Sequence, residues 1–263
     1  MFSKNTLMTS ILAIALFSVS ACSTTQTQDA QNHAVNQQKQ AAPSMPQKPV
    51  LPSLEEMAQK EIPSNRQYVE SQIVKQDGKT KYFCDKDNKL VQKKTAGGFY
   101  RVVLGTTANG DCAVQDFYAD SNTKKNEPFI VDAHHSCGKL NSGAYDDAMI
   151  TYDEKQQIDG IAHYKDGETL NILISDGDGH LMYADFSDKD KTTVTMKVYD
   201  YNLLSMVYHN DEIAELTIFG NNGVTTLIRY VNGKGDVANS YVWDKGEKVP
   251  FNNQEVLDSL TEI

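Results

Sequence analysis

The chain has 263 residues, with 25 basic and 35 acidic side chains and a net charge of −10 at pH 7. This length is enough for one β domain of ordinary size or two small ones. The acidic balance disfavours nucleic acid and anionic lipid headgroups as partners, because like charges repel.

Residues 1–21 have the features of a secretory signal peptide. Lys4 is the only charged residue, and an apolar run follows at 11–15. That run is too short to span a membrane as a helix of the mature protein. The stretch 19–22, with the sequence VSAC, resembles the lipobox of bacterial lipoproteins. The resemblance implies lipid attachment, including palmitate, at Cys22; the alternative is an ordinary signal peptide with a cysteine at its cleavage site.

The resemblance also implies a cell-envelope location, with the lipid as the membrane attachment. An aspartate after the lipidated cysteine would retain the protein at the inner membrane in the enterobacterial sorting pattern. Ser23 stands there instead, which implies the outer membrane. Residues 22–52 are polar and carry prolines at 43, 46, 49 and 52, a composition that cannot bury enough apolar surface to order itself. We expect a disordered tether with a reach of roughly 30 Å.

Residues 53–147 predict a short helix, a small β region and an irregular excursion. Ser53 can cap a helix that we expect Pro63 to end. The segments 68–74 and 81–84 indicate a hairpin around Asp77-Gly78. Strands are predicted at 99–104 and 112–118, and only 129–131 is strand-like in the excursion from 120 to 147.

Residues 148–263 predict a regular antiparallel meander. Turn residues recur about every 11 positions and leave no room for crossover helices. Apolar residues alternate along the segments, while Thr193, Thr195 and Lys197 point the other way, so we expect one buried face and one wet face. A short amphipathic helix is expected at 253–260. The predicted strands are 148–152, 158–164, 169–174, 181–186, 193–199, 203–208, 213–219, 224–231 and 240–243.

The phrase Tyr164-Lys165-Asp166-Gly167 resembles the Tyr-x-x-Gly units of MORN-type repeats. Similar units occur in bacterial YwqK-like proteins, some of which are described as antitoxin-like. The resemblance covers at most residues 148–250 and implies an open, single-layer sheet. The repeat's usual extra glycines are mostly missing, so a closed, lipocalin-like barrel is the alternative. The predicted fold class is mainly β, an up-and-down antiparallel meander with short flanking helices.

Three cysteines follow the lipobox, namely Cys84, Cys112 and Cys137. In the oxidising envelope they predict one disulfide and one leftover thiol. We favour a Cys84–Cys112 pair, because both residues lie in the early β region, and we expect Cys137 to be the odd thiol.

The segment 132–137 offers the best candidates for metal ligands or a nucleophile. Zinc is bound by imidazole and thiolate, so His134, His135 and Cys137 are weak candidates. Their spacing matches no zinc motif, and adjacent histidines in an extended segment point in opposite directions. We therefore predict no metal, no cofactor and no catalytic residue, and interpret the segment as a solvated loop.

These features favour a non-enzymatic envelope lipoprotein whose sheet binds another envelope component or a ligand. The acidic residues fall mostly in turns, where solvent surrounds them, and residues such as Thr193, Thr195 and Lys197 could form a contact surface. One alternative is an antitoxin-like or immunity-like partner of a secreted toxin, which only the YwqK resemblance suggests. The other is a metal-dependent enzyme that uses residues 132–137.

Overall fold

The computed structural model describes residues 44–132, 137–138, 147–177, 180–198, 202–220 and 223–251. Cys22, the signal peptide and the predicted helix at 253–260 lie outside these ranges. The elements are α2 (Leu54–Gln72), β1 (Ile73–Gln76), β2 (Lys81–Cys84), β3 (Leu90–Val91), β4 (Phe99–Thr107), β5 (Cys112–Tyr118), β6 (Phe129–Val131), β7 (Asp147–Tyr152), β8 (Ile158–Lys165), β9 (Glu168–Ser175), β10 (Leu181–Asp188), β11 (Lys191–Val198), β12 (Asn202–His209), β13 (Glu212–Gly220), β14 (Thr225–Val231), β15 (Lys234–Gly235), the 3₁₀ turn η3 (Val237–Asn239), β16 (Tyr241–Asp244) and β17 (Glu247–Pro250).

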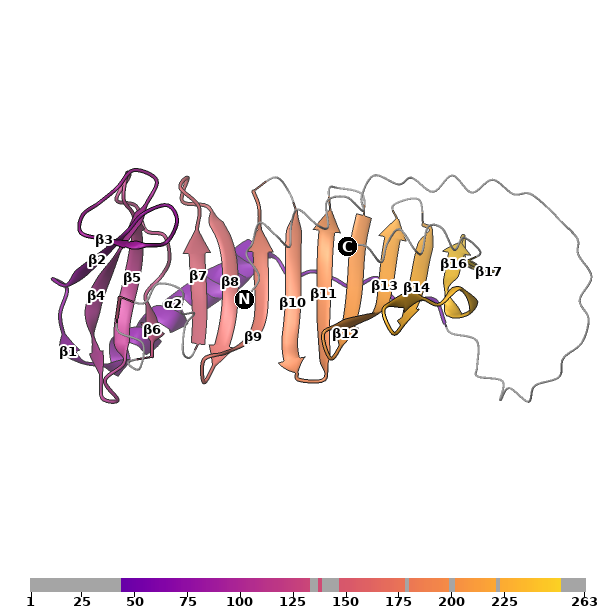
Figure 1. Ribbon diagram of the computed structural model, residues 1–263, viewed down its shortest axis with the longest axis horizontal. Helices are drawn as coiled ribbons and strands as arrows, with labels where there is room; N and C mark the ends of the chain where they lie inside the picture. Colours follow the sequence, from indigo (N-terminus) through magenta and orange to yellow (C-terminus); the bar gives the residue numbers. More distant parts are fainter. Residues whose placement is uncertain are drawn as a thin grey trace, which may run out of the picture.

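The strands form two antiparallel sheets that stand in one long row (Figure 1). The small sheet has the order β3-β2-β4-β5-β6, with β1 beside β4. The large sheet runs β17-β16-β14-β13-β12-β11-β10-β9-β8-β7, with β15 beside β14. In the large sheet β7 and β17 stand at opposite ends, so the open form of the predicted meander is confirmed. All nine strands predicted after residue 147 are present.

Tight turns with left-handed backbone set the register of the large sheet. The hairpin between β8 and β9 turns on Asp166 and Gly167, with φ angles of 50° and 77°. Positive φ at both central residues is the requirement of a type I′ turn, whose twist matches that of the flanking strands. The same arrangement recurs at Asn210-Asp211, Asn232-Gly233 and Lys245-Gly246. The predicted recurrence of turn residues is therefore observed at 166–167, 210–211 and 245–246.

The helix is longer than the sequence predicts, because Pro63 lies inside it. Ser53 caps its start as expected and accepts a hydrogen bond from the Glu56 amide at 3.3 Å. A proline inside a helix removes one backbone hydrogen bond and costs about 3 kcal/mol. Packing on both sides of Pro63 compensates for this loss: Ala58 is buried against the large sheet, and Val69 against the small sheet.

The predicted hairpin at 68–84 is also wrong. Residues 68–72 complete α2, and β1 and β2 both pair with β4 rather than with each other. β1 lies opposite 105–107 and β2 opposite 99–102, so the two strands follow one another along the same side of β4. Asp77 fills the interruption, where its carboxylate accepts hydrogen bonds from the amides of Lys79 and Thr80. The Asp-Gly pair therefore forms a local kink in a strand.

The large sheet buries side chains on both faces. On one, here called the helix face, Ile150, Ile161 and Leu173 pack against the first half of α2. The opposite face carries the larger core cluster. Its strictly alternating members are Ile174, Met182, Ala184, Val194, Met196, Leu204, Met206, Leu216 and Ile228. The alternation is as predicted, but the wet second face is not observed.

Residues 44–53 explain part of this difference, and we call them the strap. Figure 1 shows their indigo trace leaving the start of α2 and crossing behind β10 to β14 toward the β16 end. Pro46, Pro49 and Pro52 are half-buried, whereas their neighbours at 47, 48 and 50 are exposed. Prolines at every third position share one side of a polyproline helix, which has three residues per turn. The strap thus presents one proline side to the sheet.

The helix face under the strap is correspondingly shielded. On β11 to β16, two cross-strand rows of the helix face contain buried side chains. Their buried members are Leu203, Phe219, Thr225 and Trp243 in one row, and Thr195, Thr217 and Leu227 in the next. The strap and α2 together form one N-terminal cover that extends along both sheets.

Candidate functional site

The segment 123–128 joins the two sheets. Its backbone bonds to β5 on one side, where the Lys125 amide donates to the Asp116 carbonyl at 2.8 Å. On the other side it bonds to β7, where the Glu127 amide donates to the Ile150 carbonyl at 2.9 Å and the Tyr152 amide to the Lys125 carbonyl at 2.9 Å. The segment therefore acts as a short strand between the sheets, and it positions Glu127 beneath α2.

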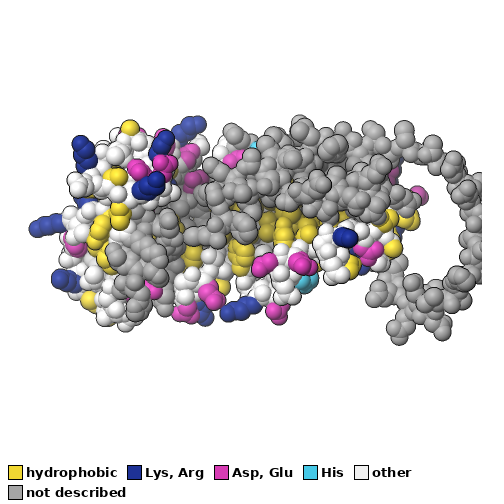
Figure 2. All heavy atoms as spheres, viewed as in Figure 1, with side chains coloured by type: hydrophobic (Ala, Val, Ile, Leu, Met, Phe, Trp, Pro, Cys, Tyr) yellow, Lys and Arg dark blue, Asp and Glu magenta, His cyan; other side chains and the backbone are white. Residues whose placement is uncertain are grey.

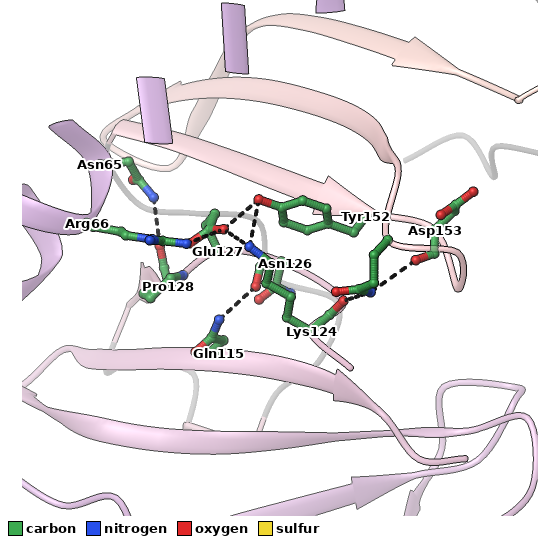
Figure 3. Close-up of polar contacts among 10 residues, drawn as sticks. Asn65, Arg66, Gln115, Lys124, Asn126, Glu127, Pro128, Tyr152 and Asp153 are labelled. Carbon is green, nitrogen blue, oxygen red and sulfur yellow. Dashed lines mark hydrogen bonds and ion pairs between the residues drawn. The ribbon is translucent and has the colours of Figure 1, made fainter. Parts of the chain in front are cut away.

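Glu127 is the centre of what we call the junction cluster, with Arg66, Lys124 and Tyr152 (Figure 3). The Glu127 side chain is fully buried. Arg66, from α2, donates to both carboxylate oxygens, at 2.6 and 2.9 Å. Lys124 and the Tyr152 hydroxyl each donate to Oε1 at 2.5 Å. One carboxylate thus connects the helix, the joining segment and the first strand of the large sheet.

The hydrogen bonds of the junction cluster keep Glu127 negatively charged. Burial alone would raise the pKa of Glu127, but the hydrogen bonds from Arg66, Lys124 and Tyr152 outweigh burial and lower this pKa to about 2. The pKa of Tyr152 is raised by burial and by its hydrogen bond to Glu127. General acids and bases act best with a pKa near the working pH, and these groups lie far from neutrality. The geometry suits a structural joint.

A second buried ion pair lies directly beside the joining segment. Arg101 on β4 donates to both oxygens of Asp116 on β5, at 2.7 and 2.9 Å, and both side chains are almost fully buried. Asn126 donates to the same carboxylate at 3.1 Å and accepts from the Asp116 amide at 2.9 Å. Asn65 of α2 adds a bond to the Pro128 carbonyl at 2.9 Å. The joining segment is therefore held by polar contacts with Asp116 of β5, which Arg101 of β4 also binds, and with Asn65 of α2.

One disulfide and one free thiol are present, as predicted, but the pairing is different. Cys112 bonds to Cys137, and Cys84 is the free, buried cysteine. The favoured Cys84–Cys112 pair is excluded by strand order: Cys84 lies opposite Phe99 at one end of β4, and Cys112 opposite Thr106 at the other. Burial raises the pKa of the Cys84 thiol to about 11, so this thiol stays protonated.

Of the three weak metal-ligand candidates, only Cys137 lies within the described residues. His134 and His135 lie outside the described residues, and Cys137 is engaged in the disulfide, so its sulfur is no thiolate ligand or nucleophile. The described part of the chain contains no group of three or more His, Cys, Asp or Glu side chains arranged to hold a metal ion. Nor does any helix within it have the length and apolar character needed to cross a membrane.

The predicted contact surface on β11 is only partly exposed. Lys197 is exposed and Thr193 half-buried, but Thr195 lies 5% exposed in a row under the strap. Lys197 also lines a groove of about 820 Å³ where the strap, α2 and the β9–β10 turn meet. Its His180 contacts Asp176 and its Asp159 contacts Thr151, so these polar groups are engaged within the chain.

Sequence reasoning missed the junction cluster altogether. Arg66 and Glu127 are 61 positions apart, and neither stands in a motif. One weak signal was available, since Glu127 is an acid directly before Pro128 in a segment with strand-like residues after it. Comparisons with family models, curated proteins and solved structures give no match to this chain.

Proposed function

We propose that this protein is a lipid-anchored envelope lipoprotein that acts as a non-enzymatic binding or structural module. The observation that supports this function best is the N-terminal cover. The strap and α2 run along one face of both sheets, and the strap ends near β16 (Figure 1). A lipid at Cys22 would therefore hold the molecule by the β16 end, with the small sheet directed away from the membrane.

The junction cluster supports the same proposal. A module that presents a surface at a distance from its anchor needs a stiff connection between its parts. Here the joining segment and the Glu127 carboxylate connect α2, β5 and β7. Polar groups that are fully satisfied in a buried network restrain a structure to one arrangement. The small sheet and the large sheet would thus move as one body.

Lipidation is tested first. In cells given radiolabelled palmitate, the Cys22→Ala variant should lose the label and accumulate as uncleaved precursor, because the thiol is the acyl acceptor. Cys84→Ala is the matched control, since it removes a different thiol and should keep the label. Label retained by Cys22→Ala would contradict the proposed anchor.

The binding role is tested by capture from the protein's own membranes. The lipidated chain, cross-linked in intact cells and purified under denaturing conditions, should carry a discrete envelope component. The Cys22→Ala precursor should not carry it. A lipidated protein that cross-links to nothing would contradict a binding role and leave only a structural one.

A further inference from the structure

Positive charge is concentrated at one end of this acidic protein. Residues 73–98 contain seven lysines and three aspartates, although the whole chain has a net charge of −10. Figure 2 shows Lys and Arg side chains gathered over the small-sheet end. All seven lysines are exposed, and they lie on β1, β2 and the turns that flank β2 and β3. We call them the lysine end: Lys75, Lys79, Lys81, Lys86, Lys89, Lys93 and Lys94.

Seven lysines against three aspartates leave this segment with a net charge of +4, and two of the aspartates are engaged by backbone amides. Asp77 accepts hydrogen bonds from the backbone of Lys79 and Thr80, and Asp85 from the amides of Asp87 and Lys89. Both carboxylates are thus used to shape turns. The cations that form ion pairs with carboxylates within the described part of the chain are other residues, namely Arg66, Arg101, Lys124, Lys189 and Arg229. The lysine end therefore offers its charge to an external anion.

An aromatic row lies beside this charge. Phe83, Tyr100 and Phe117 are cross-strand neighbours on one face of the small sheet, and the Tyr100 and Phe117 rings stack at 5.4 Å. The ammonium groups of Lys81 and Lys94 stand 5.5 and 4.1 Å from the centroid of the Tyr100 ring. Phe83 and Phe117 are partly exposed. The surface thus combines half-exposed apolar rings with cations that form no ion pair with a carboxylate of the described residues, although Lys94 also donates a hydrogen bond to the Asn122 side chain.

The lysine end lies at the end of the row opposite the proposed anchor (Figure 1). The strap ends near β16, at the far end of the row from β1 to β3 (Figure 1). At about 4.8 Å per strand, the two ends are roughly 50 Å apart or more. The lysine end would therefore face away from the anchoring bilayer.

We propose that the lysine end binds a carboxylate-bearing glycan polymer of the cell envelope, of the kind that forms the cell wall. Such a polymer supplies carboxylates for the lysines and apolar C–H faces for the aromatic row. The idea rests on the proposed function, because the anchor sets which end faces the wall. The proposed partner of the binding module is thus an acidic glycan.

The test uses lipidated protein in phosphatidylcholine proteoliposomes, mixed with purified peptidoglycan sacculi. The wild type should co-sediment with sacculi, less strongly as salt rises, and only weakly with uncharged chitin. The variant Lys86→Gln/Lys89→Gln/Lys93→Gln should lose about tenfold in affinity, because it removes three exposed charge contacts of modest individual strength. The matched control Lys165→Gln/Lys234→Gln/Lys245→Gln removes the same charge from exposed positions elsewhere and should bind like the wild type.

Each other outcome overturns the inference. Equal losses in both triple variants would mean that total charge, and no particular end, governs binding. Capture of dye-labelled phosphatidylglycerol vesicles without capture of sacculi would identify a lipid surface as the partner. A protein that keeps its palmitate label and its cross-linked envelope component, yet ignores sacculi, would refute the glycan while leaving the proposed function intact.

Discussion

The large sheet is a row of hairpins in which most strands pair with their neighbours in the chain, whereas the small sheet depends on residues from distant positions. In the large sheet the register follows from two-residue turns and alternating side chains. In the small sheet Cys112 is bonded to Cys137, and at its border Arg66 of α2 reaches Glu127 of the joining segment across 61 positions. Local pairing makes a region regular, and long-range contacts make it dependent on the rest of the fold.

The largest expected effect is the loss of the disulfide, which would show how far the small sheet depends on a cross-link. A loop of about 25 residues closed by a disulfide contributes roughly 3 kcal/mol of stability. The variant Cys112→Ala/Cys137→Ala should therefore lose about 3 kcal/mol in urea unfolding followed by circular dichroism. Amide hydrogen exchange should quicken in β4 and β5 while β11 to β13 stay protected. Uniform loss across both sheets would contradict the comparison.

The disulfide assignment itself has a simple check. Native protein should resist alkylation by N-ethylmaleimide at neutral pH, because Cys84 is buried and its pKa is raised to about 11. Unfolded in urea without reductant, the segment from 84 to 137 should take one label, on Cys84.

Glu127→Gln should have the next largest effect, and it tests whether the junction cluster unites the two sheets. Removing one partner from a buried ion pair costs 3–5 kcal/mol, but Arg66 and Lys124 reach solvent, so we expect about 2 kcal/mol. The exposed Glu154→Gln is the control and should change stability little. Two separate unfolding transitions in Glu127→Gln would show that this carboxylate couples the sheets.

Acid should weaken the same joint in the wild type. The pKa of Glu127 is about 2 in the folded chain and 4.5 for an ordinary glutamate. A carboxylate with a lowered folded pKa contributes stability above its unfolded pKa and loses it as the pH falls toward the folded value. Unfolding free energies measured from pH 5 to pH 2 should therefore fall more steeply for the wild type than for Glu127→Gln. Parallel curves would mean that Glu127 has the same pKa in the folded and unfolded chain.

The smallest effect is expected for a turn in the large sheet. Gly167 has a φ of 77°, where a β carbon costs about 1 kcal/mol, so Gly167→Ala should destabilise the protein by that amount. Asp166→Gly, at a φ of 50°, is the matched change and should be nearly neutral. Hydrogen exchange should show the loss in β8 and β9 alone. A loss that extended to β4 and β5 would mean that the large sheet is not locally specified.

The same contrast decides what the sequence could predict. Each hairpin of the large sheet depends on residues that are close together in the chain. Its strands and most of its turns could therefore be predicted from the sequence. The end of α2 was not, because Pro63 is a local helix breaker and the packing of Val69 that outweighs it comes from another part of the chain. The role of Glu127 could not be predicted for the same reason. Its role depends on a helix 61 positions earlier.

An open sheet has two ends, and they bear on how the protein avoids joining other copies of itself. Unpaired strand edges invite a strand from another molecule. Among the described residues the outermost strands are β1, of four residues, and β3, of two, at one end, and β17, of four, at the other. β17 carries the charges of Glu247 and Lys248, and its Pro250 lacks an amide hydrogen to donate. Short strands, charged side chains and a proline at these edges would disfavour the addition of a strand from another copy of the protein.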